Sequence, residues 1–203
     1  MNRKEFFNEL APSWDERFYT PELVTHLRYK LVPLFRVQPG SKILDVGAGT
    51  GGIVPFLLEA LGPGGRIWSI DFAERMVEIG RKKFENEKRV IFEVQSVETL
   101  PYEDQFFDQI IAFGVFPHLE DKARALREMN RVLKTQRTLV IAHALSSAEI
   151  RNHHKDATPV SKDFLPEREE MERLLNRAGF QMVRLIDEPK CYFCEALKIQ
   201  SAR

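Results

Sequence analysis

A glycine-rich segment between a short apolar run and an apolar-periodic segment carries the clearest chemical signal in this chain of 203 residues. The run Ile43–Val46 indicates a buried strand, and Gly47, Gly49 and Gly51 follow it at alternate positions. Closely spaced glycines let the backbone turn sharply and approach a ligand without a clash from a Cβ atom. The sequence therefore predicts a nucleotide-like cofactor at the carboxyl end of this first strand.

Asp45, two residues before the first glycine, discriminates between two classes of cofactor. Gly47, Gly49 and Gly52 also satisfy the G-x-G-x-x-G spacing of dinucleotide sites, which is a weak signal when it stands alone. A dinucleotide site holds a pyrophosphate against a helix N-terminus, where a carboxylate would repel the phosphates. S-adenosylmethionine has no phosphate, and its ammonium and sulfonium groups attract a carboxylate. We therefore favour S-adenosylmethionine, and the alternatives are a dinucleotide or a tight turn without a ligand.

A second acidic residue follows the second predicted strand, residues 66–70. Asp71 lies at the distance at which a doubly wound sheet places a carboxylate against ribose hydroxyls. This distance is common to both cofactor classes, and Asp71 also suits the N-cap of the next helix. We expect it to bind ribose, and capping is its alternative role.

The segment from Asp45 to Gly51 closely resembles motif I of the class I S-adenosylmethionine-dependent methyltransferases, and further matches follow in order over residues 42–144. The resemblance is closest to the small-molecule branch that includes the ubiquinone/menaquinone C-methyltransferases. It implies S-adenosylmethionine as cofactor, S-adenosylhomocysteine as product and a small-molecule methyl acceptor. The cofactor-binding residues that it implies are Asp45, Gly47, Ala48, Gly49, Gly51, Asp71, Phe72, Met76, Ser96, Val97, Glu98 and Phe113.

One position departs from the usual family pattern Gly-Asp-Ala-x-x-Leu-Pro after the third strand. The adenine-facing acid of that pattern falls on Ser96. We expect Ser96 and the backbone of Val97 to contact the adenine edge, with Glu98 as the alternative carboxylate. Because of this departure, a non-catalytic S-adenosylmethionine-binding protein stands beside the NAD-type oxidoreductase as an alternative to the enzyme.

Two histidines are candidates for a catalytic base. Methyl transfer is an in-line displacement at a sulfonium, so the protein chiefly supplies proximity, orientation and, for some acceptors, a base. Histidine suits that base near neutral pH. We predict His118, after the fourth strand, or His143, at the end of the fifth. His153 and His154 follow in a long connection, but adjacent histidines rarely bind one ion, so we expect no metal site.

Alternating strands and helices must position these residues, and such alternation predicts a parallel sheet. We expect strands at residues 42–46, 66–70, 90–94, 107–113 and 138–144, helices ending at 61, 84 and 133, and a late helix over 167–178. Residues 180–186 and 192–199 predict a terminal hairpin. The resemblance implies an α/β, Rossmann-like, doubly wound sheet of seven strands in the order 3-2-1-4-5-7-6, with strand 7 antiparallel.

We expect a single domain in four parts. Residues 1–36 form an aromatic-rich N-terminal helical lid, in which Trp14 and Tyr19 are candidate lid residues; ordinary surface packing is the alternative. Residues 37–145 form the cofactor-binding core, 146–166 a substrate-side insertion, and 167–203 the final helix and hairpin. A connection as long as 146–166 is usually functional or contains a short helix.

The composition disfavours several classes of protein. Lys and Arg together number 30, as do Asp and Glu, so the formal net charge is zero and a non-specific nucleic-acid binder is disfavoured. We see no apolar run of membrane-spanning length and no secretory signal, so we expect a cytoplasmic protein. Cys191 and Cys194 have C-x-x-C spacing, but residues three apart in a strand face opposite sides, so we expect no chemistry from them. The acceptor and the oligomeric state are not predicted.

Overall fold

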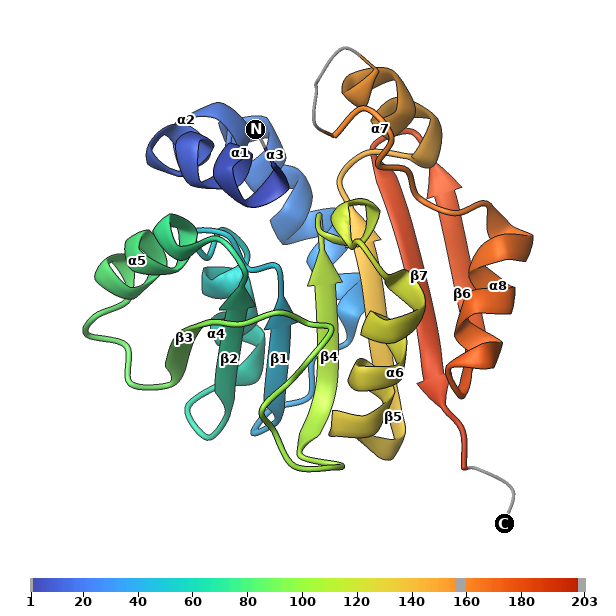
Figure 1. Ribbon diagram of the computed structural model, residues 1–203. Helices are drawn as coiled ribbons and strands as arrows, with labels where there is room; N and C mark the ends of the chain where they lie inside the picture. The colour runs from blue at the N-terminus through green and yellow to red at the C-terminus, as the bar shows by residue number, and fades with distance from the viewer. Residues whose placement is uncertain (1, 156–159, 201–203) are drawn as a thin grey trace.

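A seven-stranded sheet forms the centre of the computed structural model, which describes residues 2–155 and 160–200 (Figure 1). The order across the sheet is β3-β2-β1-β4-β5-β7-β6. The first five strands pair in parallel, and β7 is antiparallel to both β5 and β6, so the predicted order and the predicted antiparallel strand are confirmed. The strands are β1 (Lys42–Val46), β2 (Arg66–Asp71), β3 (Val90–Val94), β4 (Phe107–Phe113), β5 (Leu133–His143), β6 (Phe180–Glu188) and β7 (Cys191–Lys198).

Helices cover both faces of the sheet and the carboxyl ends of its strands (Figure 1). Buried side chains place α6 and α8 against one face and α4 against the other, while α1 and α2 lie over the carboxyl ends. The helices are α1 (Arg3–Leu10), α2 (Trp14–Phe18), α3 (Pro21–His26), α4 (Val54–Leu61), α5 (Glu74–Lys83), α6 (Lys122–Val132), α7 (Ser147–His154) and α8 (Arg168–Arg177). Short turns of other helix types are η1 (Ala11–Ser13), η2 (Leu27–Leu31), η3 (Val32–Phe35) and η4 (Phe116–His118).

The two faces of the sheet have separate apolar cores, because successive residues of a strand point to opposite faces. In β1, Leu44 packs with α6 and α8, whereas Ile43 packs with α4. The same alternation separates the two cysteines of β7. Cys194 lies in the first core and Cys191 in the second, and both are free.

β5 begins at Leu133 rather than at residue 138, so α6 passes into it without an intervening loop. Within the added segment, Gln136 adopts a positive φ of 60°. The pairing with β4 shifts register over this segment, from Phe107 opposite Leu133 to Gln109 opposite Thr138. A bulge within the strand therefore occupies residues 134–137, which the predicted ranges left between the helix and the strand.

The two segments that flank the core contain the expected helices, with differences in detail. Within the predicted N-terminal helical lid, residues 21–35 are helical throughout. This helix passes from α3 through the π turn η2 into the 3₁₀ turn η3, where Pro33 has no N–H to donate. The connection 146–166 contains α7; its residues 156–159 lie outside the described residues. Within the described part of the chain, none of the helices has the length and apolar character needed to cross a bilayer.

Local capping explains where the helices near the site begin. Asn2 accepts a hydrogen bond from the backbone N–H of Glu5, and the Glu5 side chain accepts one from the N–H of Asn2, which forms a capping box at α1. Ser146 and Glu149 form the same reciprocal pair at α7. Caps of this kind set the first turn of each helix, and with it the direction in which the following side chains point.

Candidate active site

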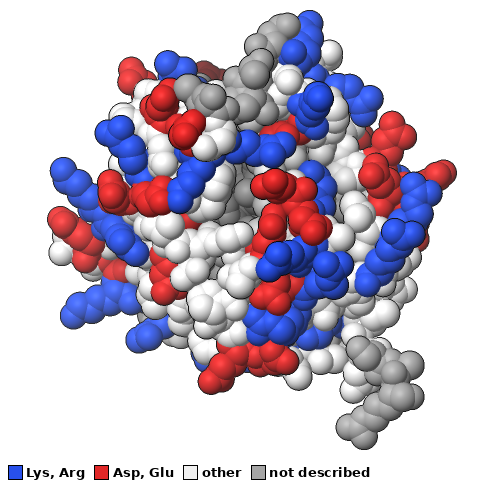
Figure 2. All heavy atoms as spheres, in the orientation of Figure 1, with Lys and Arg blue, Asp and Glu red and all other residues white. Residues whose placement is uncertain are grey.

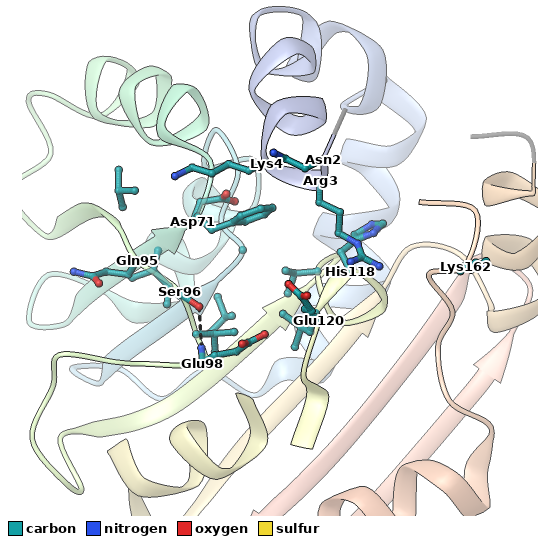
Figure 3. Close-up of a pocket in the computed structure, with 18 of the residues that line it drawn as sticks. Asn2, Arg3, Lys4, Asp71, Gln95, Ser96, Glu98, His118, Glu120 and Lys162 are labelled. Atoms are coloured by element: carbon teal, nitrogen blue, oxygen red, sulfur yellow. Dashed lines mark hydrogen bonds between the residues drawn. The ribbon is translucent and has the colours of Figure 1, made fainter. Parts of the chain in front are cut away.

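A pocket of about 920 Å³ opens at the carboxyl ends of the central strands, below the start of α1 (Figure 3). The strand order reverses between β1 and β4, and ligands of open α/β sheets bind where such a reversal opens a crevice. Acidic and basic side chains are interspersed over the face of the molecule shown in Figure 2. The residues that line the pocket include Arg3, Gly47, Asp71, Phe72, Ser96, Val97, Glu98, Val115, His118 and Lys162.

The glycine loop after β1 is enclosed so tightly that three of its positions, Gly47, Gly51 and Gly52, have no room for a side chain. A Cβ atom on Gly47, which has a φ of +67°, would lie 2.2 Å from Cγ2 of Val115. A Cβ atom on Gly52 would lie 1.8 Å from the Tyr19 ring of the N-terminal segment. The backbone of the loop is joined to β2, because the N–H of Ala48 donates to the carbonyl of Ile70 at 2.9 Å.

Asp71 lies where the pocket meets this loop. Its two carboxylate oxygens accept hydrogen bonds from the backbone N–H groups of Gly49 and Ala73, each at 2.9 Å. Burial raises the pKa of Asp71 to about 6, although these hydrogen bonds act in the opposite direction. The N-cap residue of α5 is Ala73, so the alternative prediction that Asp71 is the N-cap is wrong.

Asp45 is more deeply buried than Asp71 and does not line the pocket. It lies in β1, is 1% exposed as a residue, and its carboxylate accepts a hydrogen bond from Oγ of Ser69 at 3.1 Å. Burial raises its pKa to about 7; the Ser69 hydrogen bond lowers the pKa, and the nearby charge of Asp71 raises it. Any attraction that Asp45 exerts on a cation in the pocket acts through the glycine loop and not by direct contact.

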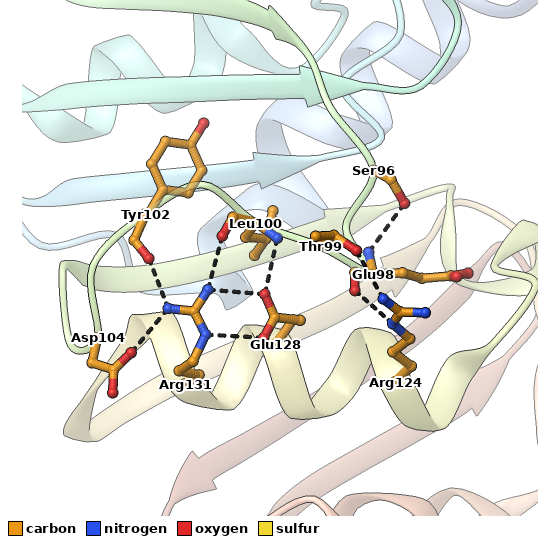
Figure 4. Close-up of polar contacts among 9 residues, drawn as sticks. All are labelled: Ser96, Glu98, Thr99, Leu100, Tyr102, Asp104, Arg124, Glu128 and Arg131. Carbon is orange, nitrogen blue, oxygen red and sulfur yellow. Dashed lines mark hydrogen bonds and ion pairs between the residues drawn. The ribbon is translucent and has the colours of Figure 1, made fainter.

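The loop after β3 forms the opposite wall, and side chains of α6 hold it in place (Figure 4). Arg131 donates to the carbonyl of Tyr102 at 2.7 Å and to that of Leu100 at 2.8 Å. Glu128 accepts the N–H of Leu100 at 2.9 Å and also pairs with Arg131. We call this set of contacts the α6 clamp, and it fixes the backbone that leads away from the pocket.

Ser96 and Glu98 both line the pocket, but the Glu98 carboxylate already has a partner. It accepts the backbone N–H of Asp121 at 3.0 Å, and the carbonyl of Glu98 accepts from Arg124 at 2.9 Å. Oγ of Ser96 accepts the N–H of Glu98 at 3.2 Å. The residue proposed as a substitute acid is thus engaged with the start of α6, which leaves Ser96 at the position of the family's acid.

His118, in the turn after β4, is held by a buried carboxylate. Its Nδ1 lies 2.8 Å from Oδ2 of Asp163, whose side chain is 1% exposed, and Arg3 pairs with the same carboxylate. A carboxylate only accepts, so Nδ1 carries the proton and Nε2 keeps its lone pair. Burial on its own would raise the pKa of Asp163, but the hydrogen bonds from His118 and Arg3 lower it to about 2.

His143 has the opposite arrangement. Its Nδ1 accepts the backbone N–H of Leu145 at 3.1 Å, so the proton of the neutral ring lies on Nε2. Burial lowers its pKa to about 3, and the neighbouring His118 acts in the same direction. A ring of this tautomer donates a hydrogen bond but presents no lone pair, and His143 does not line the pocket. The geometry therefore favours His118 over His143 as a base.

The aromatic residues of the N-terminal segment pack around the glycine loop and His118. The ring of Phe7 lies 5.2 Å from the ring of His118 and 5.9 Å from that of Phe72, in edge-to-face arrangements. Trp14 and Tyr19, the predicted lid residues, lie against Gly49 and Gly52 and do not line the pocket. They pack against the glycine loop, whereas Phe7 packs against His118.

The pocket thus unites only part of the predicted site. The predicted residues that line it are Gly47, Asp71, Phe72, Ser96, Val97, Glu98 and His118. The predicted residues that do not line it are Asp45, Ala48, Gly49, Gly51, Met76, Phe113 and His143. Sequence reasoning missed Arg3, Val115 and Asp163, for which no local pattern gives a signal. Across residues 2–155 and 160–200, no group of three or more His, Cys, Asp or Glu side chains is placed to hold a metal ion.

Comparisons with known proteins agree with the geometry. A family model described as a methyltransferase domain matches residues 38–187. The ubiquinone/menaquinone biosynthesis C-methyltransferase UbiE of Bordetella avium is 33% identical over 141 residues, which cover 68% of this chain and 55% of the relative. The chain therefore spans about half the length of that relative. A demethylmenaquinone methyltransferase of Staphylococcus aureus is 32% identical over 174 residues, covering 73% of this chain and 71% of the relative.

A solved structure extends the similarity over nearly the whole fold. A SAM-dependent methyltransferase from Aquifex aeolicus superposes with a TM-score of 0.74 at 24% identity, covering 93% of this chain and 98% of its own. At that identity the likeness supports the fold, while the domain match and the curated relatives support the family. The cofactor is accordingly S-adenosylmethionine and not a dinucleotide. With its sheet order and its glycine loop, the chain belongs to the class I S-adenosylmethionine-dependent methyltransferases.

Proposed function

We propose that this protein transfers the methyl group of S-adenosylmethionine to a small-molecule acceptor, whose proton is taken up by Nε2 of His118. The observation that carries the proposal is that one pocket is lined by Gly47 and Asp71 at one side and by His118 at the other (Figure 3). When bound, the cofactor supplies a methyl group that the sulfonium has already activated. The protein therefore has to orient the acceptor and remove its proton.

The residues around the glycine loop suit this cofactor. Each carboxylate oxygen of Asp71 accepts one backbone hydrogen bond and retains a further lone pair, which suits the two hydroxyls of a ribose. A side chain at position 47 would displace Val115, and glycine avoids this clash. The volume of about 920 Å³ lies toward the upper end of the range of small-molecule sites, enough for more than a cofactor alone.

His118 is suited to accept a proton at neutral pH. Its Nδ1–H is held by Asp163, so the ring presents Nε2 as the lone-pair nitrogen, and the imidazolium that forms is stabilised by the carboxylate beside it. Burial lowers the pKa of His118 despite the opposing effect of Asp163, so the ring is neutral near pH 7 before it accepts a proton. We therefore expect an acceptor with a removable proton on oxygen, nitrogen, sulfur or an activated carbon.

The apolar part of the pocket supports a small organic acceptor. Phe72, Val115 and Leu119 line it beside His118. The names of the curated relatives describe methyltransferases of quinone biosynthesis, which supports a small-molecule acceptor for this chain as well. An aromatic hydroxyl or an enolisable ketone unites an apolar body with an acidic proton and fits both features.

Two experiments test the proposal in sequence. Calorimetric titration with S-adenosylhomocysteine should show micromolar binding, while a parallel titration with NADH shows none. A panel of small phenols, enolisable ketones, thiols and amines should then contain an acceptor that produces S-adenosylhomocysteine and a product heavier by one methylene. Binding of NADH alone would contradict the cofactor assignment. Tight binding of S-adenosylhomocysteine without turnover on any acceptor would indicate a non-catalytic binding protein.

A further inference from the structure

We infer that Arg3 and Asp163 are positioning residues, through which the docked N-terminal helix holds His118 as an oriented base on the acceptor side of the pocket. The role of a base rests on the proposed function, whereas the coupling between the helix and the histidine does not. The two parts can therefore be tested separately.

Three distant segments meet at the Asp163 carboxylate. Arg3 belongs to α1, His118 to the turn after β4, and Asp163 to the segment after α7, so the contacts join residues 160 and 45 positions apart. Oδ1 accepts from Nη2 of Arg3 at 2.5 Å, and Oδ2 accepts from Nε of Arg3 at 3.1 Å and from Nδ1 of His118 at 2.8 Å. In Figure 3 the Arg3 side chain extends from α1 toward His118.

The solvent exposure of the three side chains shows why Asp163 depends on the docking of α1. The Asp163 side chain is 1% exposed, that of His118 12% and that of Arg3 34%. A buried carboxylate without a partner is strongly unfavourable, so Asp163 remains a buried anion only while its partners are in place. Arg3 supplies the permanent positive charge, and it reaches Asp163 only from the docked α1. Docking of α1 thereby brings Arg3 to the carboxylate that holds His118.

Further contacts keep the ring from turning. Phe7, also in α1, packs edge-to-face at 5.2 Å from the His118 ring, and the His154 ring lies 5.0 Å from it. Nδ1 of His154 lies 2.8 Å from the backbone carbonyl of Asp163, which fixes the segment that carries the carboxylate. Because Asp163 occupies Nδ1 of His118, Nε2 is the nitrogen left for the pocket that His118 lines.

The charged and titratable groups on the elements around His118 determine in which direction each substitution should shift the pKa of His118. They are Arg3 from α1, His154 and Asp163 from α7 and the segment after it, Glu120 and Lys122 from the turn and helix that follow His118, and His143 from β5. Burial is the largest influence and lowers the pKa of His118; Asp163 raises that pKa, and His154 and Arg3 lower it. Removing the charge of Arg3 should therefore raise the pKa, and neutralising Asp163 should lower it.

Nitrogen-15 NMR titration of the histidine side chains measures this directly in the full-length protein, with S-adenosylhomocysteine bound and without any acceptor. We expect Arg3→Met to raise the pKa of His118 and Asp163→Asn to lower it. Arg17→Met, an exposed arginine of α2, is the matched control and should leave the pKa unchanged. Arg3→Lys keeps the charge and should stay close to the wild type, so the arginine variants decide the matter even if Asp163→Asn does not fold.

The same variants give a kinetic readout once an acceptor is known. Asp163→Asn should reduce kcat by about 10- to 100-fold, a part of what a general base contributes. The acidic limb of the kcat/KM profile should move up in pH for Arg3→Met and down for Asp163→Asn, with little change in S-adenosylhomocysteine affinity. A role in folding alone would lower stability without shifts of opposite sign.

The outcomes separate the inference from the proposed function. Opposite pKa shifts in Arg3→Met and Asp163→Asn, with the Arg17→Met control unchanged, support the coupling. Shifts in the same direction, or no shift in Arg3→Met, overturn it, even if methyl transfer is observed. Opposite shifts in a protein that turns over no acceptor would leave the coupling in place and would refute the role of His118 as a base.

Discussion

The two walls of the pocket are held by different kinds of contact. On the cofactor side, the α6 clamp ties the loop after β3 to a core helix through backbone carbonyls and N–H groups. On the acceptor side, a single carboxylate, Asp163, joins His118 to an arginine of the N-terminal helix. The first wall belongs to the folded core, whereas the second also needs a separate segment to dock. We therefore expect cofactor binding and turnover to respond to different substitutions.

The exposure of the two networks sharpens this contrast. Arg131 of the α6 clamp is 32% exposed and its partner Glu128 is 22% exposed, so solvent can replace a lost bond. Asp163 is 1% exposed and has no such replacement. Breaking a buried ion pair costs about 3–5 kcal/mol, whereas an exposed pair contributes about 1 kcal/mol or less. The acceptor wall should therefore respond more steeply to single substitutions than the cofactor wall.

The largest effect is expected at the base. His118→Gln keeps a donor toward Asp163 but removes the basic nitrogen, so kcat should fall by about 10²- to 10⁴-fold. The affinity for S-adenosylhomocysteine should change by less than about threefold, because a general base mainly lowers the barrier of the step in which it acts. Steady-state kinetics and calorimetry on the same preparation measure both quantities.

His143→Gln is the matched control for that substitution. Its ring is a donor and does not line the pocket, so its loss should reduce kcat far less than the loss of His118. An equal loss in the two variants would contradict the assignment of the base. A large loss of cofactor affinity in His118→Gln would contradict the separation of the two walls.

The next effect concerns the buried Asp45 on the cofactor side. Its folded pKa of about 7 lies above that of an ordinary Asp, so its contribution to the stability of the apoprotein is present below about pH 4 and is lost as the pH rises through 7. Asp45→Asn should therefore stabilise the apoprotein, and by about 1–3 kcal/mol more at pH 8 than at pH 5. The same variant should bind S-adenosylhomocysteine about tenfold more weakly, since a charge that attracts the ammonium is lost.

Urea unfolding at the two pH values, together with calorimetry, measures both effects of Asp45→Asn. Ser69→Ala is a useful companion variant, because it removes the hydrogen bond to Asp45 but keeps the carboxylate. It should raise the pKa of Asp45 further and extend to higher pH the range over which stability falls. If Asp45→Asn is less stable than the wild type at pH 8, the buried carboxylate does not destabilise the apoprotein.

The contrast between the walls also explains what the sequence could predict. Gly47 and Ser96 follow strands and Asp71 ends one, and the strand order alone brings the carboxyl ends together. The cofactor wall is therefore encoded by short local patterns. Asp163 lies in a segment without periodicity, and its partner Arg3 is 160 residues away, so no pattern in either neighbourhood signals their contact.

The fold was predictable for a similar reason. The bounds of β1, β3 and β4 agree with the predicted ranges, because apolar runs between turn residues define them. The start of β5 was wrong because Gln136 takes up a positive φ that usually signals a glycine, and the strand bulges there instead of turning. The sequence shows which residues favour such a conformation, but it does not show when the surrounding pairing imposes it on another residue.

A smaller effect is expected when the α6 clamp is weakened. Arg131→Met removes the hydrogen bonds to the carbonyls of Leu100 and Tyr102, which should lower the free energy of unfolding by about 1–2 kcal/mol, since solvent reaches the site. S-adenosylhomocysteine affinity should fall by a few fold while kcat at saturation is retained. Arg127→Met, at an exposed position of the same helix, is the control and should change neither. Loss of kcat without loss of affinity would show that the clamp serves the acceptor wall instead.

The smallest expected effect is a gain, and it tests the departure at Ser96. In Ser96→Asp a carboxylate is restored at the family's adenine-facing position, and a charge-assisted hydrogen bond there should tighten S-adenosylhomocysteine binding by about three- to tenfold. Ser96→Asn has nearly the same shape without the charge and should gain less. Glu98 limits the gain, because its carboxylate, held by the N–H of Asp121, also lines the pocket and repels a second negative charge. The contrary result would be that Ser96→Asp binds S-adenosylhomocysteine no more tightly than Ser96→Asn does. In that case the backbone that the α6 clamp holds in place is sufficient to bind the adenine edge, and cofactor binding does not need the family's acid.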